Sequence, residues 1–349
     1  MERIGRIVSA DRSAYGAAKR KWDSIAKPLG SFGVLEEHIC RLAAVQGTDS
    51  PDISKRCVAI MCGDHGVCEE GVTQCGIEVT AECAADIACG RSNVNAVAKT
   101  YGADVLAVDV GIASDVKCSR LLHRKVSYGT RNMTKGPAMT REEAEKAITA
   151  GLDIAGQLKA EGRKLIVVGE MGIGNTTAAS AIASVLTGLP PEKVTGRGAG
   201  LSTEGLIRKR EAVRRAIEVN SPDPSDALDV LCKVGGLEIA AMTGIFLGGA
   251  YYSVMTVIDG VISSAAAALA VLIEPKCREY MLASHCSGEP AGKGLLDIVG
   301  QRAVIDAGLR LGEGTGGLLL IPLLDGALSL YNNARRFDDT TIERYVELK

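Results

Sequence analysis

The chain has 349 residues, which is enough for one large domain or two ordinary domains with a sizeable core. Its formal net charge is -2 and it contains no block of basic residues, so electrostatics give no reason to expect a nucleic-acid partner. Only 3% of the residues are aromatic while 41 are glycine, a composition that suits a tightly turned α/β enzyme better than an all-β sandwich.

Helices and strands are expected in a regular order along the chain. The N-terminal segment to about residue 46 has a helical pattern that breaks where Pro28 and Gly30 demand a turn, and Ser31 can cap the helix that follows. From Arg56 onward, short apolar runs alternate with helical patterns. The expected strands are 58–61, 105–110, 165–168, 254–258 and 280–284, and the expected helices are 78–98, 141–160, 177–186, 204–219, 237–246, 263–273, 295–311 and 317–332.

Strands that recur at intervals of roughly 30 residues, with helices between them, predict a parallel sheet covered on both faces. One stretch, 239–258, carries no charge over a length that meets the criterion for a membrane span. Because Gly244, Gly248 and Gly249 interrupt it, we interpret it as a buried helix, a glycine turn and a buried strand. No membrane span is expected.

The cysteines indicate a reducing compartment. Six of the eleven lie between Cys57 and Cys89 at irregular gaps, and the start of the chain lacks the apolar core of a signal peptide. We therefore expect free thiols in a cytoplasmic protein. Cys62, His65 and Cys68 raise the question of a metal site, but a fourth ligand is missing, and cysteine as a small buried hydrophobe is the better interpretation. We expect neither a metal nor a cofactor.

The chain is organised around a strand, a tight turn and a helix over 165–186. The apolar run ends in a turn with glycines at positions 169, 172 and 174, which let the backbone approach a ligand closely, and Asn175 and Thr176 can cap the helix. A helix N-terminus offers free N–H groups to an anion, most often a phosphate. The turn is neither a P-loop nor Gly-x-Gly-x-x-Gly, and a plain βα connection is the alternative. Similar polar and glycine-rich motifs follow the other strands, where open α/β sheets bind ligands.

Several of these motifs occur together, in a fixed order, in one known family. The chain resembles the nicotinate-nucleotide–dimethylbenzimidazole phosphoribosyltransferase family from about residue 23 to 335. The resemblance implies a Rossmann-like parallel sheet with helices on both faces in a large domain, 45–325, and a small helical domain made from 1–44 with 326–349. It also implies a dimer, because the family's active site is completed near the subunit interface. The motifs are Lys27-Pro28-Leu29-Gly30-Ser31, Gly63-Asp64-His65-Gly66-Val67, Gly129-Thr130-Arg131-Asn132-Met133, Gly169 to Thr177, Gly196-Arg197-Gly198, Val234 to Ala240, Asp259-Gly260, Ser284-His285 with Glu289-Pro290, and Leu311 to Gly316.

The family's reaction moves the phosphoribosyl group of nicotinate mononucleotide to a base, giving an α-ribotide and nicotinate. It needs an acceptor stripped of its proton, and the resemblance assigns the general base to Glu313. Without the resemblance, Glu313 is an acid near a helix N-terminus, Lys209 an exposed lysine on a charged helix, and Glu170 a solvated turn residue. The resemblance instead implies a substrate site that contains Glu170, Gly172, Gly174, Asn175, Thr176, Gly198, Lys209, Ser287 and Leu311, with the phosphate on the turn residues.

The acceptor side departs from the family pattern around Thr73, Glu82 and Arg91, where an aromatic wall is lost and polar groups are added. Dimethylbenzimidazole is the first expectation for the acceptor, and a phenol or para-cresol, used by heterodimeric relatives, is the alternative. The chain is thus expected to be a homodimer or a heterodimer with a paralogue, and a non-catalytic partner subunit is a further alternative. A nucleotide-binding dehydrogenase is disfavoured because Gly-x-Gly-x-x-Gly is missing.

Overall fold

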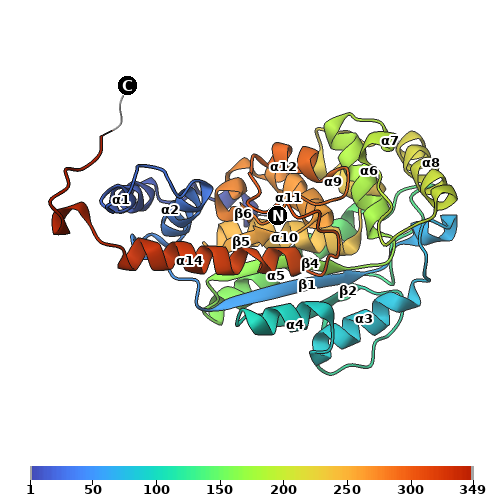
Figure 1. Ribbon diagram of the computed structural model, residues 1–349. Coiled ribbons are helices and arrows are strands. Elements are labelled where there is room, and N and C mark those ends of the chain that lie inside the picture. Colours follow the sequence, from blue (N-terminus) through green and yellow to red (C-terminus); the bar gives the residue numbers. More distant parts are fainter. Residues whose placement is uncertain (1, 347–349) are drawn as a thin grey trace.

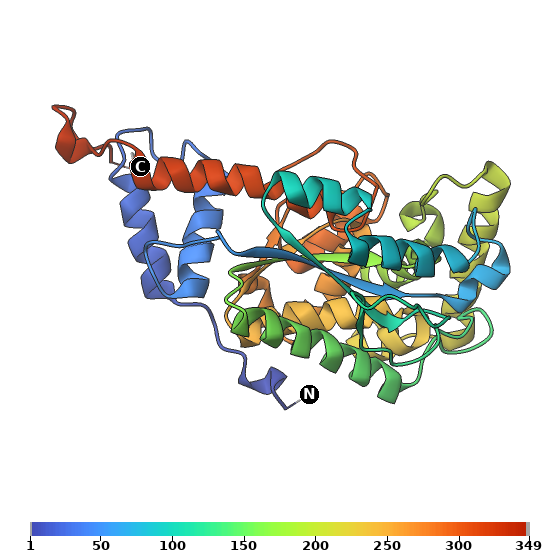
Figure 2. The same cartoon turned by 90° about the horizontal axis from the view of Figure 1, so that it is seen from below.

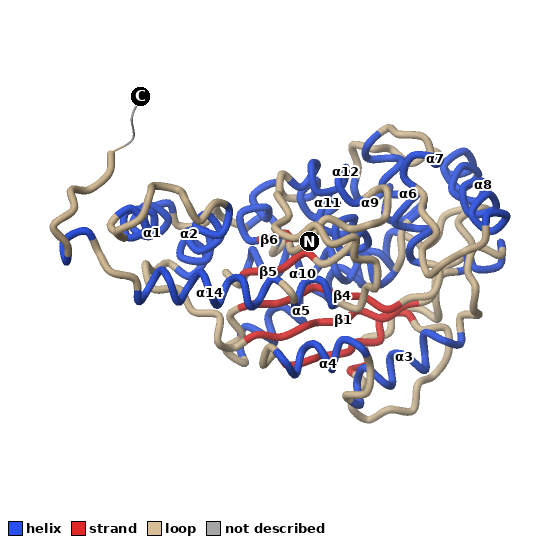
Figure 3. Tube along the Cα trace, in the orientation of Figure 1, coloured by secondary structure: helices blue, strands red, loops and turns tan. Residues whose placement is uncertain are grey.

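A single parallel sheet forms the centre of the computed structural model, which describes residues 2–346 (Figure 3). Its strands run in the order β3-β2-β1-β4-β5-β6, and every neighbouring pair is parallel. Buried apolar side chains line the strands on both faces, as a sheet sandwiched between helices requires. The predicted doubly covered α/β sheet is confirmed. The strands are β1 (Arg56–Gly63), β2 (Asp104–Gly111), β3 (Leu122–His123), β4 (Leu165–Met171), β5 (Met255–Ile258) and β6 (Met281–Ala283).

Helices cover the two faces of the sheet, as Figure 2 shows. One face carries α5 (Arg141–Ala160) and α10 (Leu237–Tyr251), and the other carries α3 (Glu78–Cys89), α4 (Asn93–Thr100) and α14 (Leu320–Asn333). The α5–α10 contact is very close. A Cβ at Gly151 would lie 1.8 Å from the Ala241 carbonyl oxygen, and one at Gly244 would lie 2.0 Å from that of Ile148. Glycine at these positions therefore lets the two helix backbones touch.

Helices from near the two ends of the chain lie side by side at one edge of the molecule (Figures 1 and 2). Helices α1 (Arg12–Asp23) and α2 (Val34–Gln46) pack there with α14, and the Trp22 and Tyr331 rings have centroids 5.1 Å apart. A small helical domain from 1–44 with 326–349 stays a prediction, and α14 crosses its boundary without a break. The remaining helices are α6 (Asn175–Thr187), α7 (Pro191–Val194), α8 (Thr203–Asn220), α9 (Ala227–Val234), α11 (Val261–Ile273), α12 (Gly292–Val299) and α13 (Thr315–Leu318), with 3-10 turns η1 (Ile4–Arg6), η2 (Gly66–Glu70), η3 (Pro275–Tyr280) and η4 (Phe337–Asp339).

Glycine placement corrects two predicted helices. The single helix predicted over 78–98 is wrong, because Gly90 takes φ +81° and ends α3, and Ser92 opens a capping box that starts α4. The helix predicted over 295–311 is also wrong. α12 ends at Val299, where Gly300 takes φ +74°, and the chain then continues as a loop to residue 314.

Three smaller predictions also need correction. The glycine turn expected near 248–249 is helical, and α10 continues to Tyr251 because Gly248 packs on Ala155 of α5. The helix predicted over 317–332 divides into α13 and α14 at Leu319. Ser31 does not cap α2, whose N-cap is Gly33. Helix α5 begins as predicted, with a capping box between Thr140 and Glu143.

Three further findings concern residues 2–346. No helix in that range has the length and apolar character needed to cross a membrane. No group of three or more His, Cys, Asp or Glu side chains in the same range is arranged to hold a metal ion. All eleven cysteines are free thiols.

Candidate active site

A cavity of about 240 Å³ lies at the carboxyl ends of β4, β5 and β6. The strand order reverses between β1 and β4, and the crevice beside such a reversal is where open α/β sheets bind ligands. Side chains reach the cavity from the three strand ends, from the start of α6 and from the loop before α13. The lining includes Cys83, Glu170, Gly172, Asn175, Thr176, Gly198, Asp259, Ser263, His285, Ser287, Glu289, Arg310, Leu311 and Glu313.

The turn after β4 is shaped by glycines. A Cβ at Gly172 would lie 2.2 Å from the Gly63 carbonyl oxygen, so β1 and this turn are in direct contact. Gly174 takes φ +98° as the N-cap of α6, and no side chain caps that helix. The predicted capping by Asn175 or Thr176 is therefore wrong, since both are already helical. The start of α6 is left open to an anion. Gly174 itself lies behind the cavity wall, against Cys68 and His65.

A buried lysine stands beside this helix start. Lys209, on α8, is only 1% exposed, and its Nζ donates a 2.8 Å hydrogen bond to Thr176 Oγ1. Burial lowers the pKa of Lys209 to about 8, while the nearby Glu289 carboxylate acts in the opposite direction. Gly198 takes φ +56°, and a Cβ there would lie 3.2 Å from Nζ. The reading of Lys209 as an exposed lysine is wrong.

Two buried carboxyl groups, Glu170 and Asp259, line the cavity close to the start of α6. Burial, together with the negative charges of Asp259 and Glu238, raises the pKa of Glu170 to about 8. Asn175 donates a side-chain hydrogen bond to Glu170, which favours the ionised form but does not offset the burial. Glu170 is 7% exposed, so the reading of it as a solvated turn residue is wrong. A strongly perturbed acid in a cleft marks a candidate functional site, and a positively charged guest would favour the ionised form of Glu170.

Glu313 lies in a strained loop that is fixed over β4. Its φ is +60°, between Gly312 at +88° and Gly314 at +82°. Asp259 accepts hydrogen bonds from the Gly314 N–H, at 3.2 Å, and the Gly317 N–H, at 2.7 Å. Left-handed backbone at a residue other than glycine persists only where its surroundings hold it, and such strain concentrates at functional sites.

The Glu313 side chain reaches from this loop toward a second helix. Its Oε2 accepts a 3.3 Å hydrogen bond from the Val94 N–H in the first turn of α4. The carboxylate thus lies near a helix N-terminus, as the residue alone suggested, but the helix is α4 rather than the one that follows it in sequence.

The other predicted residues divide into two groups. Ser287 and Leu311 line the cavity, and Leu311 is 61% exposed at its mouth. Thr73 and Glu82 do not line it. The Thr73 hydroxyl donates to the Cys75 carbonyl oxygen at 2.8 Å, and Glu82 is exposed on α3. Cys83, the residue after Glu82, faces the cavity instead, because each residue along a helix is rotated by about 100° from the one before it.

Sequence reasoning gave no role to Asp259 and His285, although both follow predicted strands. Asp259 comes directly after β5 and His285 two residues after β6, at the sheet edge where ligands bind. Their position after predicted strands could therefore have identified both as candidate site residues. Burial lowers the pKa of His285, and its Nδ1 lies 3.1 Å from the Ser284 hydroxyl.

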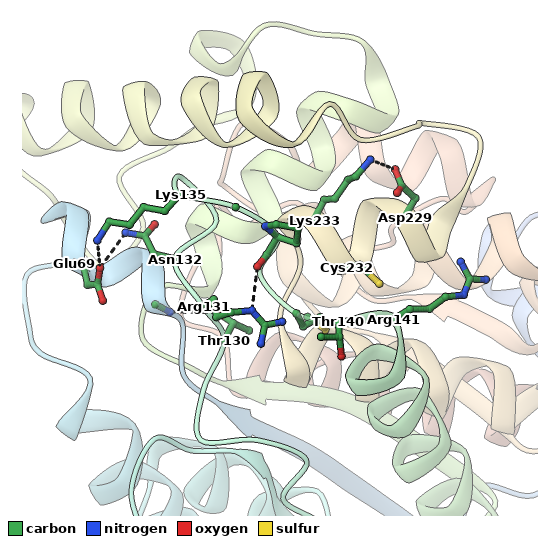
Figure 4. Close-up of a pocket in the computed structure, with 14 residues that line it drawn as sticks. Glu69, Thr130, Arg131, Asn132, Lys135, Thr140, Arg141, Asp229, Cys232 and Lys233 are labelled. Atoms are coloured by element: carbon green, nitrogen blue, oxygen red, sulfur yellow. Dashed lines mark hydrogen bonds and ion pairs between the residues drawn. The ribbon is translucent and has the colours of Figure 1, made fainter.

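A larger and more open hollow, of about 740 Å³, lies elsewhere, between η2, α9 and the 130–141 segment (Figure 4). Its cations are already paired with acids. Lys135 contacts Glu69 at 2.6 Å, and Lys233 contacts Asp229 at 2.9 Å. It has no glycine-lined helix start and no buried lysine, so we place the candidate active site in the smaller cavity.

Comparisons with known proteins show which family the chain belongs to. A profile of the family described as Phosphoribosyltransferase matches residues 7–342. The nicotinate-nucleotide–dimethylbenzimidazole phosphoribosyltransferase of Ruminiclostridium cellulolyticum is 44% identical over 348 residues, covering 100% of this chain and 99% of its own. The enzyme of that name from Acetivibrio thermocellus is 44% identical over 94% of this chain and 93% of its own. The crystal structure of CobT from Thermus thermophilus superposes with a TM-score of 0.90 at 40% identity, covering 95% of this chain and 100% of that one. The chain belongs to the nicotinate-nucleotide–dimethylbenzimidazole phosphoribosyltransferase family.

Proposed function

We propose that this chain transfers the phosphoribosyl group of nicotinate mononucleotide to 5,6-dimethylbenzimidazole, releasing nicotinate and an α-ribotide for cobamide biosynthesis. The names of its relatives support this reaction. One observation carries the proposal: a single cavity joins an open helix N-terminus to the buried carboxyl groups of Glu170 and Asp259, and the buried Lys209 contacts Thr176 of that helix from behind the cavity wall. That pairing matches a donor with a phosphate at one end and a cationic pyridinium ring at the other.

The phosphate of the donor is proposed to lie on the turn at Gly172 and on the first residue of α6, Asn175, while Gly174 shapes that turn from behind the cavity wall. Thr176 and Lys209 would donate to its oxygens, and Ser287 would complete this side of the site. Charge-assisted hydrogen bonds of this kind are stronger than neutral ones. Gly198 supports the assignment because a side chain there would collide with the Lys209–Thr176 contact.

The nicotinate end is proposed to lie toward Glu170. In nicotinate mononucleotide the ring nitrogen is positively charged, and it becomes neutral when the bond to C1′ breaks and it keeps the electron pair. The positive charge of the bound donor would favour the ionised form of Glu170, and that carboxylate would hold ribose hydroxyls and stabilise positive charge that develops on the ribose in the transition state. Because nicotinate leaves with a neutral pyridine nitrogen, no general acid is needed for its departure.

Glu313 is proposed as the general base. As one nitrogen of the benzimidazole attacks C1′, the carboxylate takes the proton from the other nitrogen. The position of Glu313 in the cavity wall supports this role, and so does the fixed loop that carries it. A general base must be held within hydrogen-bond reach of the benzimidazole nitrogen that gives up its proton. A mobile loop could not hold it there.

The acceptor is proposed to lie between Cys83, Glu313 and Leu311. The relatives described above are named for dimethylbenzimidazole, and their names give no support to the phenol or para-cresol alternative. Thr73 and Glu82, which suggested that alternative, are displaced from the cavity wall, so they are proposed to act on acceptor choice only at its margin.

We further propose a homodimer whose second subunit covers the cavity mouth. The support is Leu311, a large apolar side chain that is 61% exposed beside the substrate site. A heterodimer with a paralogue is the alternative. Light scattering on the purified chain distinguishes a homodimer from a monomer that awaits another subunit.

A competition assay tests the reaction. Purified chain is incubated with nicotinate mononucleotide and equal amounts of dimethylbenzimidazole, adenine and para-cresol, and the products are identified by mass. The proposal expects the dimethylbenzimidazole ribotide as the main product. A cresol ribotide would establish the phenol alternative, and no product from any acceptor would favour a non-catalytic partner subunit.

A further inference from the structure

Two cysteines that are distant in sequence lie side by side at the surface of the molecule. Cys89 is the last residue of α3, and Cys118 lies in the segment between β2 and β3. Their Sγ atoms are 3.7 Å apart, and both side chains are partly exposed. A disulfide has an S–S length of about 2.05 Å, so closure requires an approach of about 1.7 Å. Cys118 belongs to a loop and Cys89 is the last residue of a helix, so both residues can share that movement.

The surroundings of the pair favour a reactive thiolate. The Arg120 backbone N–H, the Cys89 thiol and the Arg120 guanidinium lower the pKa of Cys118, with the Arg120 backbone as the largest cause. Cys89 and Arg120 also line an open hollow of about 520 Å³ that includes Lys99. The charged residues of that hollow are two cations, Lys99 and Arg120, and one acid, Asp104, so a small anionic reagent meets a net positive charge there. Elsewhere burial raises the pKa of Cys57 and Cys68 to about 12, which keeps those thiols protonated.

We propose that Cys89 and Cys118 form a reversible intramolecular disulfide when the chain meets a low-molecular-weight disulfide such as glutathione disulfide. The Cys118 thiolate attacks one sulfur of the reagent and releases one glutathione thiolate, giving a mixed disulfide. The Cys89 thiol, after loss of its proton to solvent, attacks the Cys118 sulfur and releases the second glutathione. Two protein thiols are oxidised and one disulfide is reduced to two thiols. A dithiol reductant reverses both steps.

The bond would act on the start of α4. Cys89 is followed by Gly90, Arg91 and Ser92, and then by α4. The Val94 N–H in the first turn of α4 donates to Glu313 at 3.3 Å, already a long hydrogen bond. A displacement of Cys89 toward Cys118 is therefore transmitted through three residues to the helix turn that holds the Glu313 carboxylate.

Peptide mapping by mass spectrometry tests the proposal. The folded chain is incubated with excess glutathione disulfide, remaining thiols are blocked, and the digest is searched for a peptide that joins Cys89 to Cys118 and has lost two hydrogens. We expect that cross-link as the dominant new disulfide, and we expect it to disappear with dithiothreitol. Hydrogen exchange at residues 90–94 should change on oxidation, a readout that does not depend on any catalytic activity.

Variants separate this pair from the other cysteines. Cys89→Ser should stop at a glutathione adduct on Cys118, and Cys118→Ser should show neither the adduct nor a change in exchange at residues 90–94. Cys232→Ser, which alters another partly exposed thiol on α9, should behave as the wild type. A folded wild-type chain that forms no Cys89–Cys118 cross-link, or forms it only after denaturation, would overturn the proposal.

Discussion

Replacing Glu170 by glutamine tests the electrostatics of the buried acid cluster. In the folded chain the pKa of Glu170 is about 8, compared with an ordinary value of 4.5. Between those two pH values the folded chain keeps a proton that the unfolded chain has released. Raising the pH through this window therefore lowers the free energy of unfolding by about 1.4 kcal/mol per pH unit. The stabilisation is fully present below pH 4.5, and it is lost by about pH 8.

Glutamine is neutral at every pH, has nearly the same shape and can still accept the hydrogen bond from Asn175. The Glu170→Gln variant should therefore gain stability over the wild type as the pH rises. The gain should be under about 1 kcal/mol at pH 5, about 3 kcal/mol at pH 7 and about 5 kcal/mol above pH 8. The window follows from burial and from the charges of Asp259 and Glu238.

Urea unfolding followed by circular dichroism, at pH 5, 6, 7 and 8.5, measures this difference. Glu142→Gln is the matched control, because Glu142 is an exposed acid in the first turn of α5. Its difference from the wild type should stay flat across the series. A flat difference for Glu170→Gln as well would refute the view that Glu170 is held protonated in the folded chain.

Three other variants probe the substrate site. Glu313→Gln should lower kcat by roughly 10²-fold or more with little change in the Kd of nicotinate mononucleotide, and a kcat equal to the wild type would remove Glu313 as the base. Lys209→Gln should weaken mononucleotide binding by about 10- to 100-fold in calorimetry, because a charge-assisted hydrogen bond is lost, whereas the exposed control Lys193→Gln should not. Wild-type affinity should itself fall above about pH 8, where Lys209 loses its charge, and an affinity independent of pH would contradict that contact. Gly198→Ala should lower the free energy of unfolding by about 1–2 kcal/mol, because φ +56° is strained for alanine and the new Cβ meets Thr176. A variant as stable as the wild type would count against that strain.

The sheet was predictable because its strands are buried on both faces and alternate with helical patterns along the chain. Helix α5 is the clearest case, since Thr140 and Glu143 mark its start in the sequence. Strand β3 was missed because two residues are too few to show any pattern. The long helix predicted after residue 295 failed because its apolar pattern took no account of Gly300, whose left-handed backbone ends α12.

Lys209 shows how a site residue can be misread from composition. Helix α8 is rich in charge, which suggested a solvated lysine. The same helix buries Gly205, Ala212, Val213 and Ala216, and Lys209 lies on that stripe at helical spacing. Its burial was therefore visible as a charged residue on an apolar face.

Other features of the site depend on contacts that no local pattern encodes. The hydrogen bond from Val94 to Glu313 joins residues 219 positions apart, and it follows only from packing α4 over the loop. The exchange of Glu82 for Cys83 in the cavity wall rests on the rotation of α3 about its own axis. A shift of one residue is enough to move a side chain from the cavity to solvent.

The stereochemistry and stoichiometry of one reaction test the proposed displacement at C1′ most directly. Purified chain is given nicotinate mononucleotide and dimethylbenzimidazole. Proton NMR follows the signal of the hydrogen on C1′ while free nicotinate is measured. A single displacement at C1′ predicts one nicotinate for each ribotide, with the product in the α configuration. A β-configured ribotide, or release of nicotinate without any ribotide, would contradict the proposed displacement in this cavity.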